Sequence, residues 1–254
     1  MIRTGICWLL GIVLMAILMF GPDPGRAAGT TDQIKRRATQ YYYGWGVPQN
    51  YSRALAFYLQ AAKDGDPQAQ YIAGGMYFKG LGTAVDYTKA FELLYKAANN
   101  GNSTVESQKV LAQSFILGHG VPPNLEEAMH WYTLAAEQGD PEALNEMGFI
   151  YFTGSGVEQD YDKAFEIFSQ AAYKGYLLSQ FNLGIMLYTG NTSAGQDFAK
   201  AYAWFSVAAV KGHEQARQAM QVLAAAFSPE QLKNAQAQAK LIYEKLQPDL
   251  RTKK

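Results

Sequence analysis

Apolar positions recur along most of the chain with a period of about 36 residues. In each period an alanine is followed three and four positions later by a pair of large residues, and seven and eight positions later by Ala-Ala. These offsets follow one face of a helix with 3.6 residues per turn, so each period contains one amphipathic helix, called here the second helix. The leading alanines lie 36, 38, 36 and 37 residues apart and are Ala54, Ala90, Ala128, Ala164 and Ala201.

Polar residues and glycines mark the two ends of every predicted second helix. Four positions before the leading alanine stands an Asn or Asp, whose side-chain oxygen can accept from the free amides of a starting helix. A glycine three positions after the Ala-Ala pair suits the left-handed conformation that ends a helix. The starting residues are Asn50, Asp86, Asn124, Asp160 and Asp197, and the glycines are Gly65, Gly101, Gly139, Gly175 and Gly212.

A first helix precedes each second helix and has its own pattern. A central small residue is followed three positions later by a large residue and three positions after that by a glycine; the small residues are Gly74, Ala112, Gly148 and Gly184. A glycine in mid-helix costs about 1 kcal/mol relative to alanine. Its recurrence therefore predicts that two helix backbones approach each other closely at this position. Gly-x-Gly turns join the helices, except that the fifth turn, Gly190-Asn191-Thr192-Ser193, has one extra residue.

These residues resemble the Sel-one-like repeats, relatives of the tetratricopeptide repeat with a slightly longer period. The motif is most complete across residues 147–175, and the resemblance covers about residues 38–216. It implies an all-α fold, a right-handed α-solenoid of about five helix–turn–helix repeats. For function it implies an adaptor or regulator, and in exported bacterial members an envelope scaffold or a partner of signalling and secretion proteins.

The end of the array needs a cap, because one repeat cannot bury its apolar face alone. Ala216, Met220, Leu223 and Phe227 stand at helical spacing, and Ser228 with Gln231 forms a predicted capping box for a last helix. We therefore expect a repeat solenoid over residues 29–216 and C-terminal capping helices with a frayed tail over 217–254. At the other end, residues 29–43 are predicted to supply an incomplete first helix.

The first residues follow the pattern of an export signal. Arg3 precedes a 15-residue apolar run from Ile6 to Phe20, and the small residues Ala27-Ala28-Gly29 follow. The run is shorter than the roughly 20 residues that comfortably span a bilayer. Residues 1–28 are therefore expected to be a cleaved signal peptide that directs the protein to the periplasm or outside the cell, with an uncleaved membrane anchor as the alternative.

Charge and reactive side chains narrow the function classes. The chain carries 22 basic and 22 acidic residues, so no excess positive charge favours nucleic acid. The only cysteine, Cys7, falls within the expected signal. His119, His130 and His213 have no partner at metal-ligand spacing. We therefore expect no metal, no cofactor and no catalytic residue, and a scaffold in place of an enzyme. The alternative, a periplasmic cell-wall hydrolase or ligand-binding protein, rests on the expected compartment alone.

The first helices carry a second stripe, three positions before, one after and four after the central small residue. It is rich in aromatic residues, and the proposed partner-binding members are Tyr71, Phe78, Gln113, Asn145, Phe149, Phe152, Phe181 and Tyr188. One interpretation is packing against the preceding repeat, since apolar stripes at helical spacing usually belong to a core. The other is a concave surface for one or more partner proteins, with aromatic anchors and hydrogen bonds from Gln113 and Asn145. A membrane would be a partner only if the N-terminal segment stays uncleaved.

Overall fold

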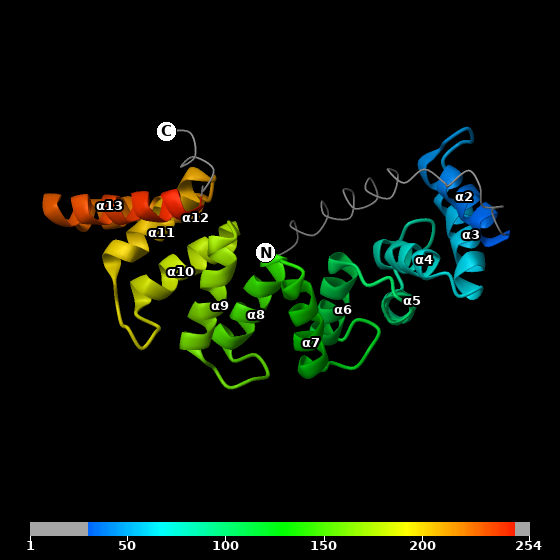
Figure 1. Ribbon diagram of the computed structural model, residues 1–254, viewed down its shortest axis with the longest axis horizontal. Helices are drawn as coiled ribbons and strands as arrows, with labels where there is room; N and C mark the ends of the chain where they lie inside the picture. The colour runs from blue at the N-terminus through cyan, green and yellow to red at the C-terminus, as the bar shows by residue number, and fades with distance from the viewer. Residues whose placement is uncertain (1–29, 247–254) are drawn as a thin grey trace. The chain divides into compact units, whose positions relative to one another are not determined.

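Helical hairpins make up the protein in a computed structural model that describes residues 30–246 (Figure 1). Within this range there are twelve helices and no strand, as an all-α repeat solenoid requires. The helices are α2 (Thr30–Tyr43), α3 (Tyr51–Lys63), α4 (Pro67–Lys79), α5 (Tyr87–Asn99), α6 (Val105–Leu117), α7 (Leu125–Glu137), α8 (Pro141–Thr153), α9 (Tyr161–Tyr173), α10 (Leu177–Thr189), α11 (Phe198–Val210), α12 (Glu214–Ala226) and α13 (Pro229–Leu246).

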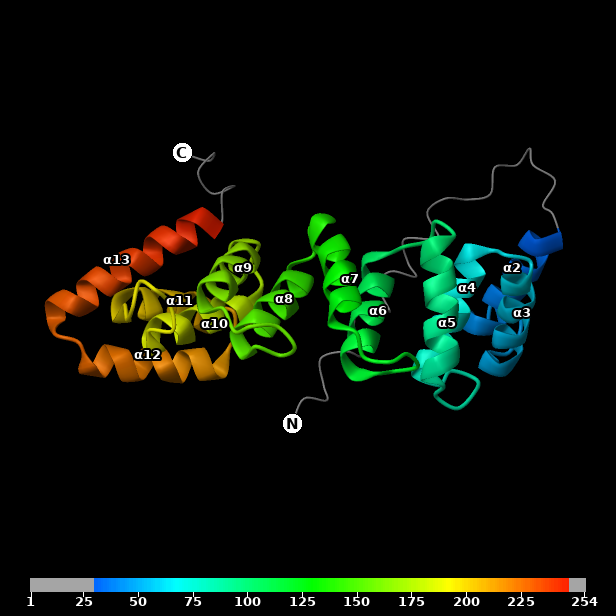
Figure 2. The ribbon, with the colours of Figure 1, turned by 90° about the horizontal axis from the view of Figure 1, so that it is seen from below.

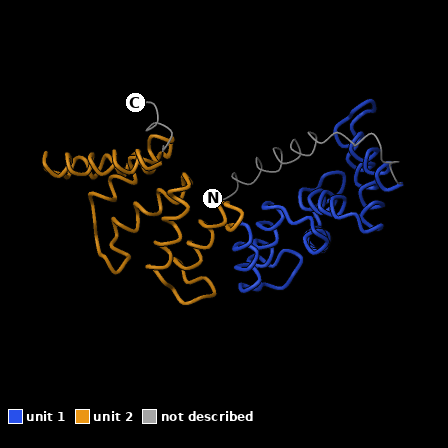
Figure 3. Tube along the Cα trace, in the orientation of Figure 1, with its two compact units in different colours: residues 1–135 blue, residues 136–254 orange. Residues whose placement is uncertain are grey.

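The chain divides into two compact units, residues 1–135 and 136–254 (Figure 3). In the first, α2 packs on α3 and α4 on α5. In the second, α8 packs on α9 and α10 on α11. The expected signal segment, residues 1–28, and the end of the C-terminal tail lie outside the described residues. Among residues 30–246, no helix combines the length and the apolar character needed to cross a membrane.

The predicted second helices are α3, α5, α7, α9 and α11, and their ends are confirmed. All five leading alanines are buried. Each predicted starting residue accepts a hydrogen bond from the backbone amide three positions on; the Asp160 carboxylate, for example, lies 2.9 Å from Lys163 N. The five closing glycines all have φ between 85° and 94°. Residue type alone therefore fixed both ends of these helices.

The prediction for the mid-helix glycines needs a correction. At Gly74 the backbone of the second helix does come close, since an ideal Cβ would lie 3.2 Å from the carbonyl oxygen of Ala90, but at Gly148 and Gly184 the nearest group is a side chain of the second helix. An ideal Cβ at Gly148 would lie 2.8 Å from the Phe168 ring, and one at Gly184 would lie 2.5 Å from the Phe205 ring. At Gly148 and Gly184 the glycine therefore makes room for a buried aromatic ring of the second helix.

The second glycine of a turn touches the preceding hairpin. An ideal Cβ at Gly82 would lie 2.4 Å from the carbonyl carbon of Tyr51, and one at Gly120 would lie 2.3 Å from the carbonyl oxygen of Tyr87. Both glycines have positive φ, so a side chain there would be strained as well as obstructed. Gly82 and Gly120 thus let their turns lie directly against the preceding hairpin, whereas Gly46 has no such neighbour.

The C-terminal helices α12 and α13 both pack against α11 (Figures 1 and 2). The predicted capping box is present: Ser228 N donates to Gln231 Oε1 at 2.8 Å, and Gln231 N donates to Ser228 Oγ at 3.3 Å. Leu223 and Ile242 join the core cluster that contains Trp204. The expected boundary between residues 216 and 217 lies inside α12, because this helix already begins at Glu214.

Candidate protein-interaction surface

The predicted stripe lies on the first helices α4, α6, α8 and α10, and its members differ in exposure. Tyr71 and Asn145, both three positions before the central small residue, are only 5% and 4% exposed. Asn145 Oδ1 accepts hydrogen bonds from Ser179 Oγ at 2.8 Å and from Asn182 Nδ2 at 3.2 Å. This amide oxygen therefore joins α8 to α10. Gln113 and Phe181 are half-buried.

The aromatic residues four positions after the central small residue close the hairpins. Phe78, Phe152 and Tyr188 each meet the first residue of the following second helix edge to face. The ring centroids are 5.5 Å apart for Phe78–Tyr87, 5.4 Å for Phe152–Tyr161 and 5.6 Å for Tyr188–Phe198, with interplanar angles of 64°, 62° and 63°. Tyr42 and Tyr51 make the same kind of contact in the first hairpin. These pairs, which we call the aromatic clasps, stabilise the hairpins.

Among the proposed partner-binding residues of the stripe, the exposed ones lie on α8 and α10. Phe149, one position after Gly148, is 51% exposed, and Tyr188 is 42% exposed although one edge of its ring is used in a clasp. Ile185, three positions before Tyr188, is half-buried, and α10 has no charged residue over 177–189. Exposed large apolar side chains are suited to contact another protein. We call Phe149, Ile185 and Tyr188 the exposed stripe.

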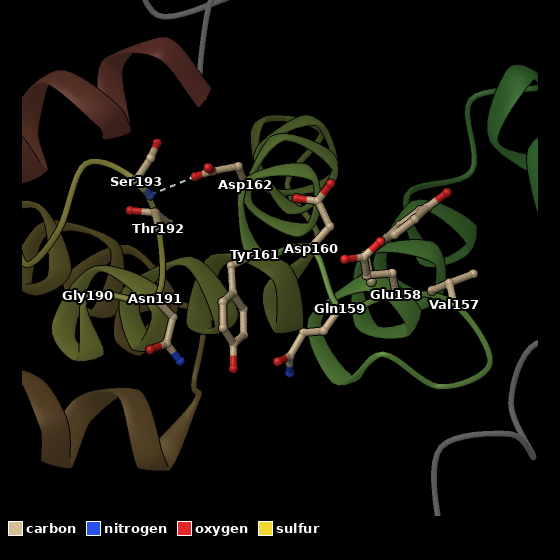
Figure 4. A pocket seen from close by; sticks show the side chains of 11 residues that line it. Val157, Glu158, Gln159, Asp160, Tyr161, Asp162, Gly190, Asn191, Thr192 and Ser193 are labelled. Carbon is tan, nitrogen blue, oxygen red and sulfur yellow. Dashed lines mark hydrogen bonds between the residues drawn. The ribbon is translucent and has the colours of Figure 1, made fainter.

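A polar hollow of about 710 Å³ lies between the start of α9 and the fifth turn (Figure 4). Two of its carboxylates accept backbone hydrogen bonds. Asp160 caps α9, and Asp162 accepts from Ser193 N at 2.8 Å, the bond drawn as a dashed line. The extra residue in the fifth turn was the sequence signal for this irregularity, although the pattern did not predict a hollow.

Lys163, near the hollow, also has a partner, and two basic side chains elsewhere make the same kind of contact. The ammonium of Lys163 lies 4.1 Å from the centroid of the Tyr151 ring, and a side-chain hydrogen bond with Tyr151 raises the pKa of Lys163. Comparable contacts occur between Lys89 and Tyr77 and between Arg53 and Tyr41. In each case the attraction between the cation and the aromatic ring links the start of a second helix to the end of its first helix.

The three histidines have different neighbours. His119 stacks on Tyr87 at 4.2 Å, His130 is exposed beside Trp131, and His213 begins α12. Over the described part of the chain, no group of three or more His, Cys, Asp or Glu side chains is arranged to hold a metal ion.

The model of the Sel1 repeat matches five consecutive segments, residues 38–66, 67–102, 105–140, 141–176 and 177–213. The chain belongs to the Sel1 repeat family. Each segment from the second to the fifth contains one first helix and one second helix. The expected resemblance is thus confirmed, and Sel1 repeat proteins are scaffolds for protein–protein interaction that are generally not catalytic.

Curated relatives share part of their length with this Sel1 repeat protein. An uncharacterized protein of Neisseria meningitidis is 31% identical over 123 residues, which are 48% of this chain and 25% of the relative. The mouse protein sel-1 homolog 2 is 39% identical over 103 residues, which are 41% of this chain and 15% of the relative. The chain thus matches a quarter or less of the length of these relatives.

Two solved structures have the same repeat fold. A protective antigen of uropathogenic Escherichia coli with an SLR fold is 31% identical and has a TM-score of 0.68, covering 84% of this chain and 46% of that one. A Sel1 repeat protein from Oxalobacter formigenes is 27% identical and has a TM-score of 0.64, covering 92% of this chain and 93% of that one.

Proposed function

We propose that this Sel1 repeat protein is an exported, non-catalytic scaffold that binds another protein through the exposed stripe on α8 and α10. It would act as an adaptor or regulator of an envelope complex or of a signalling pathway. Export is supported by the basic start and the apolar run Ile6–Phe20. The periplasm is then the compartment in which the partner is sought.

The observation that carries the proposal is the exposure of Phe149 and Tyr188. A single exposed apolar residue needs no explanation, but two large aromatic side chains are exposed here on the first helices of successive repeats. Aromatic residues have few rotatable bonds and bury a large area, and they are enriched among the residues that dominate binding energy. The clasp between Tyr188 and Phe198 further restrains one anchor before a partner binds.

Affinity capture with matched variants tests this proposal. The double variant F149A/Y188A removes both anchors, whereas V222A/L241A removes side chains that are 64% and 59% exposed on the capping helices. Removing an anchor of this kind lowers the binding free energy by more than about 1 kcal/mol. We therefore expect capture of the specific partner to fall at least roughly tenfold with F149A/Y188A. Capture should stay unchanged with V222A/L241A.

The capture is made from the native cell envelope and quantified by mass spectrometry. Both variants should keep the helical circular dichroism spectrum of the unmodified protein. Equal capture by both variants would remove the exposed stripe as the binding site. The same preparation shows whether residues 1–28 remain on the envelope protein, which tests the proposed signal separately.

A further inference from the structure

His213 occupies a position that acidic residues hold in other repeats. Asp66 and Asp140 are the N-cap residues of α4 and α8, and each carboxylate accepts a hydrogen bond from a backbone amide at 2.7 Å. At α12 the imidazole does this instead: His213 Nδ1 accepts from Ala216 N at 3.2 Å. Only the ring that is unprotonated at Nδ1 can accept this bond. The cap of α12 therefore depends on the protonation state of one side chain.

The same ring is packed against the fifth repeat. It stacks on Phe181 of α10 with centroids 4.3 Å apart and planes inclined by 23°. Burial is the cause that lowers the pKa of His213 from its ordinary value of 6.5. The stack positions the imidazole for the cap, and the burial favours the neutral form that the cap needs.

The charged groups near this ring are few. Helix α10 has none over residues 177–189. Lys211, after the end of α11, donates through Nζ to the carbonyl oxygen of Gly175 at 3.0 Å. On α12 itself, Glu214 forms an ion pair with Arg217, and the charged residues of α13 are Glu230, Lys233, Lys240, Glu244 and Lys245. The carboxylate nearest in sequence is thus already paired with a cation.

We propose that His213 is a pH-sensitive cap that loosens the start of α12 when the imidazole is protonated. Protonation turns Nδ1 from an acceptor into a donor that faces another donor, Ala216 N. It also places a positive charge at the N-terminus of a helix, where the backbone dipole is unfavourable for cations. Helix α12 buries Ala216 and Leu223 in the core that contains Phe205, so the loosening reaches the packing of the last repeat.

The direction of the pH dependence follows from linkage. A basic group whose pKa is lower in the folded than in the unfolded protein makes its full contribution to stability when the pH is above its pKa in the unfolded protein. This contribution is lost as the pH falls through its pKa in the folded protein. The His213 contribution is therefore complete at pH 7.5 and declines below about 6.5. The inference is independent of the proposed partner surface, because it concerns the isolated chain.

Amide exchange of the full chain between pH 7.5 and 5.5 tests the proposal. After correction for the intrinsic pH dependence of exchange, the first turn of α12 should open on the order of fivefold more often at pH 5.5, the size expected for a lost helix cap. The variant H213N keeps an N-cap oxygen but cannot titrate in this range, so its corrected exchange should be flat. H130N removes the exposed histidine beside Trp131 and should keep the pH dependence of the unmodified protein.

Nuclear magnetic resonance of the same samples gives a second measurement. The His213 ring and the Ala216 amide should titrate together, with a midpoint below 6.5. The proposal is overturned if the Ala216 amide stays constant while the ring titrates, or if H213N and the unmodified protein show the same corrected exchange at both pH values.

Discussion

Gly184 shows how a single missing side chain sets the packing of a hairpin. The Phe205 ring lies where a Cβ would stand, and the ring is itself almost fully buried. Gly75 gives the contrast: it is also in mid-helix, but an added Cβ would meet no atom within 4 Å. Substitution by alanine at position 75 therefore measures the helix preference of alanine alone, whereas the same substitution at position 184 adds a steric clash.

For G184A we expect net destabilisation by up to about 2 kcal/mol, because overpacking a core costs roughly 1–3 kcal/mol and the helix preference of alanine offsets about 1 kcal/mol of this cost. For G75A we expect stabilisation by up to about 1 kcal/mol, since only the helix preference acts. Urea unfolding monitored by circular dichroism measures both. If the two substitutions shift the midpoint in the same direction, the steric account of the mid-helix glycines fails.

On the scale of one helix, α8 carries two phenylalanines with different environments. Phe152 is half-buried and forms a clasp with Tyr161. The centroid of its ring lies 6.5 Å from the centroid of the Phe168 ring. Phe149 is half-exposed to solvent on the same helix. The two alternatives for the stripe, core and partner surface, can therefore both apply to one helix at different positions.

We expect F152A to lower the free energy of unfolding by about 2 kcal/mol, through lost burial and a lost aromatic pair. F149A should change it by no more than about 0.5 kcal/mol, as surface substitutions usually do. Thermal and urea unfolding of the two variants provide the comparison. A loss of 2 kcal/mol or more with F149A would mean that this ring is part of the core.

Much of each element could be predicted from residue types alone. Asn50 and its counterparts cap helices, and Gly65 and its counterparts end them, because these effects act within a few residues. The exposure of Phe149 and the burial of Asn145 could not be predicted in this way. They depend on the neighbouring hairpin, and Ser179 and Asn182, which accommodate Asn145, lie more than 30 residues away in sequence. The imidazole cap of α12 could not be predicted from the sequence pattern either, which considered His213 only as a possible metal ligand.

On the scale of the whole molecule, the interior of a repeat array is assembled from many local contacts. In the second unit, one core cluster contains Phe168 of α9, Leu183 of α10, Phe205 of α11, Leu223 of α12 and Ile242 of α13. None of these residues belongs to the exposed stripe. Ile185 of the exposed stripe packs partly against this cluster, and Tyr188 also closes a hairpin through its clasp, so these two side chains serve the fold as well as the proposed surface.

Photo-crosslinking in the native cell tests the central claim most directly. A benzoylphenylalanine is placed at position 149 or 188 of the exposed stripe, and in matched proteins at position 222 or 241 of the capping helices. The account predicts a discrete crosslinked protein partner from positions 149 and 188 and none from 222 and 241. Crosslinks from the capping positions alone, or no crosslink from either stripe position, would contradict it.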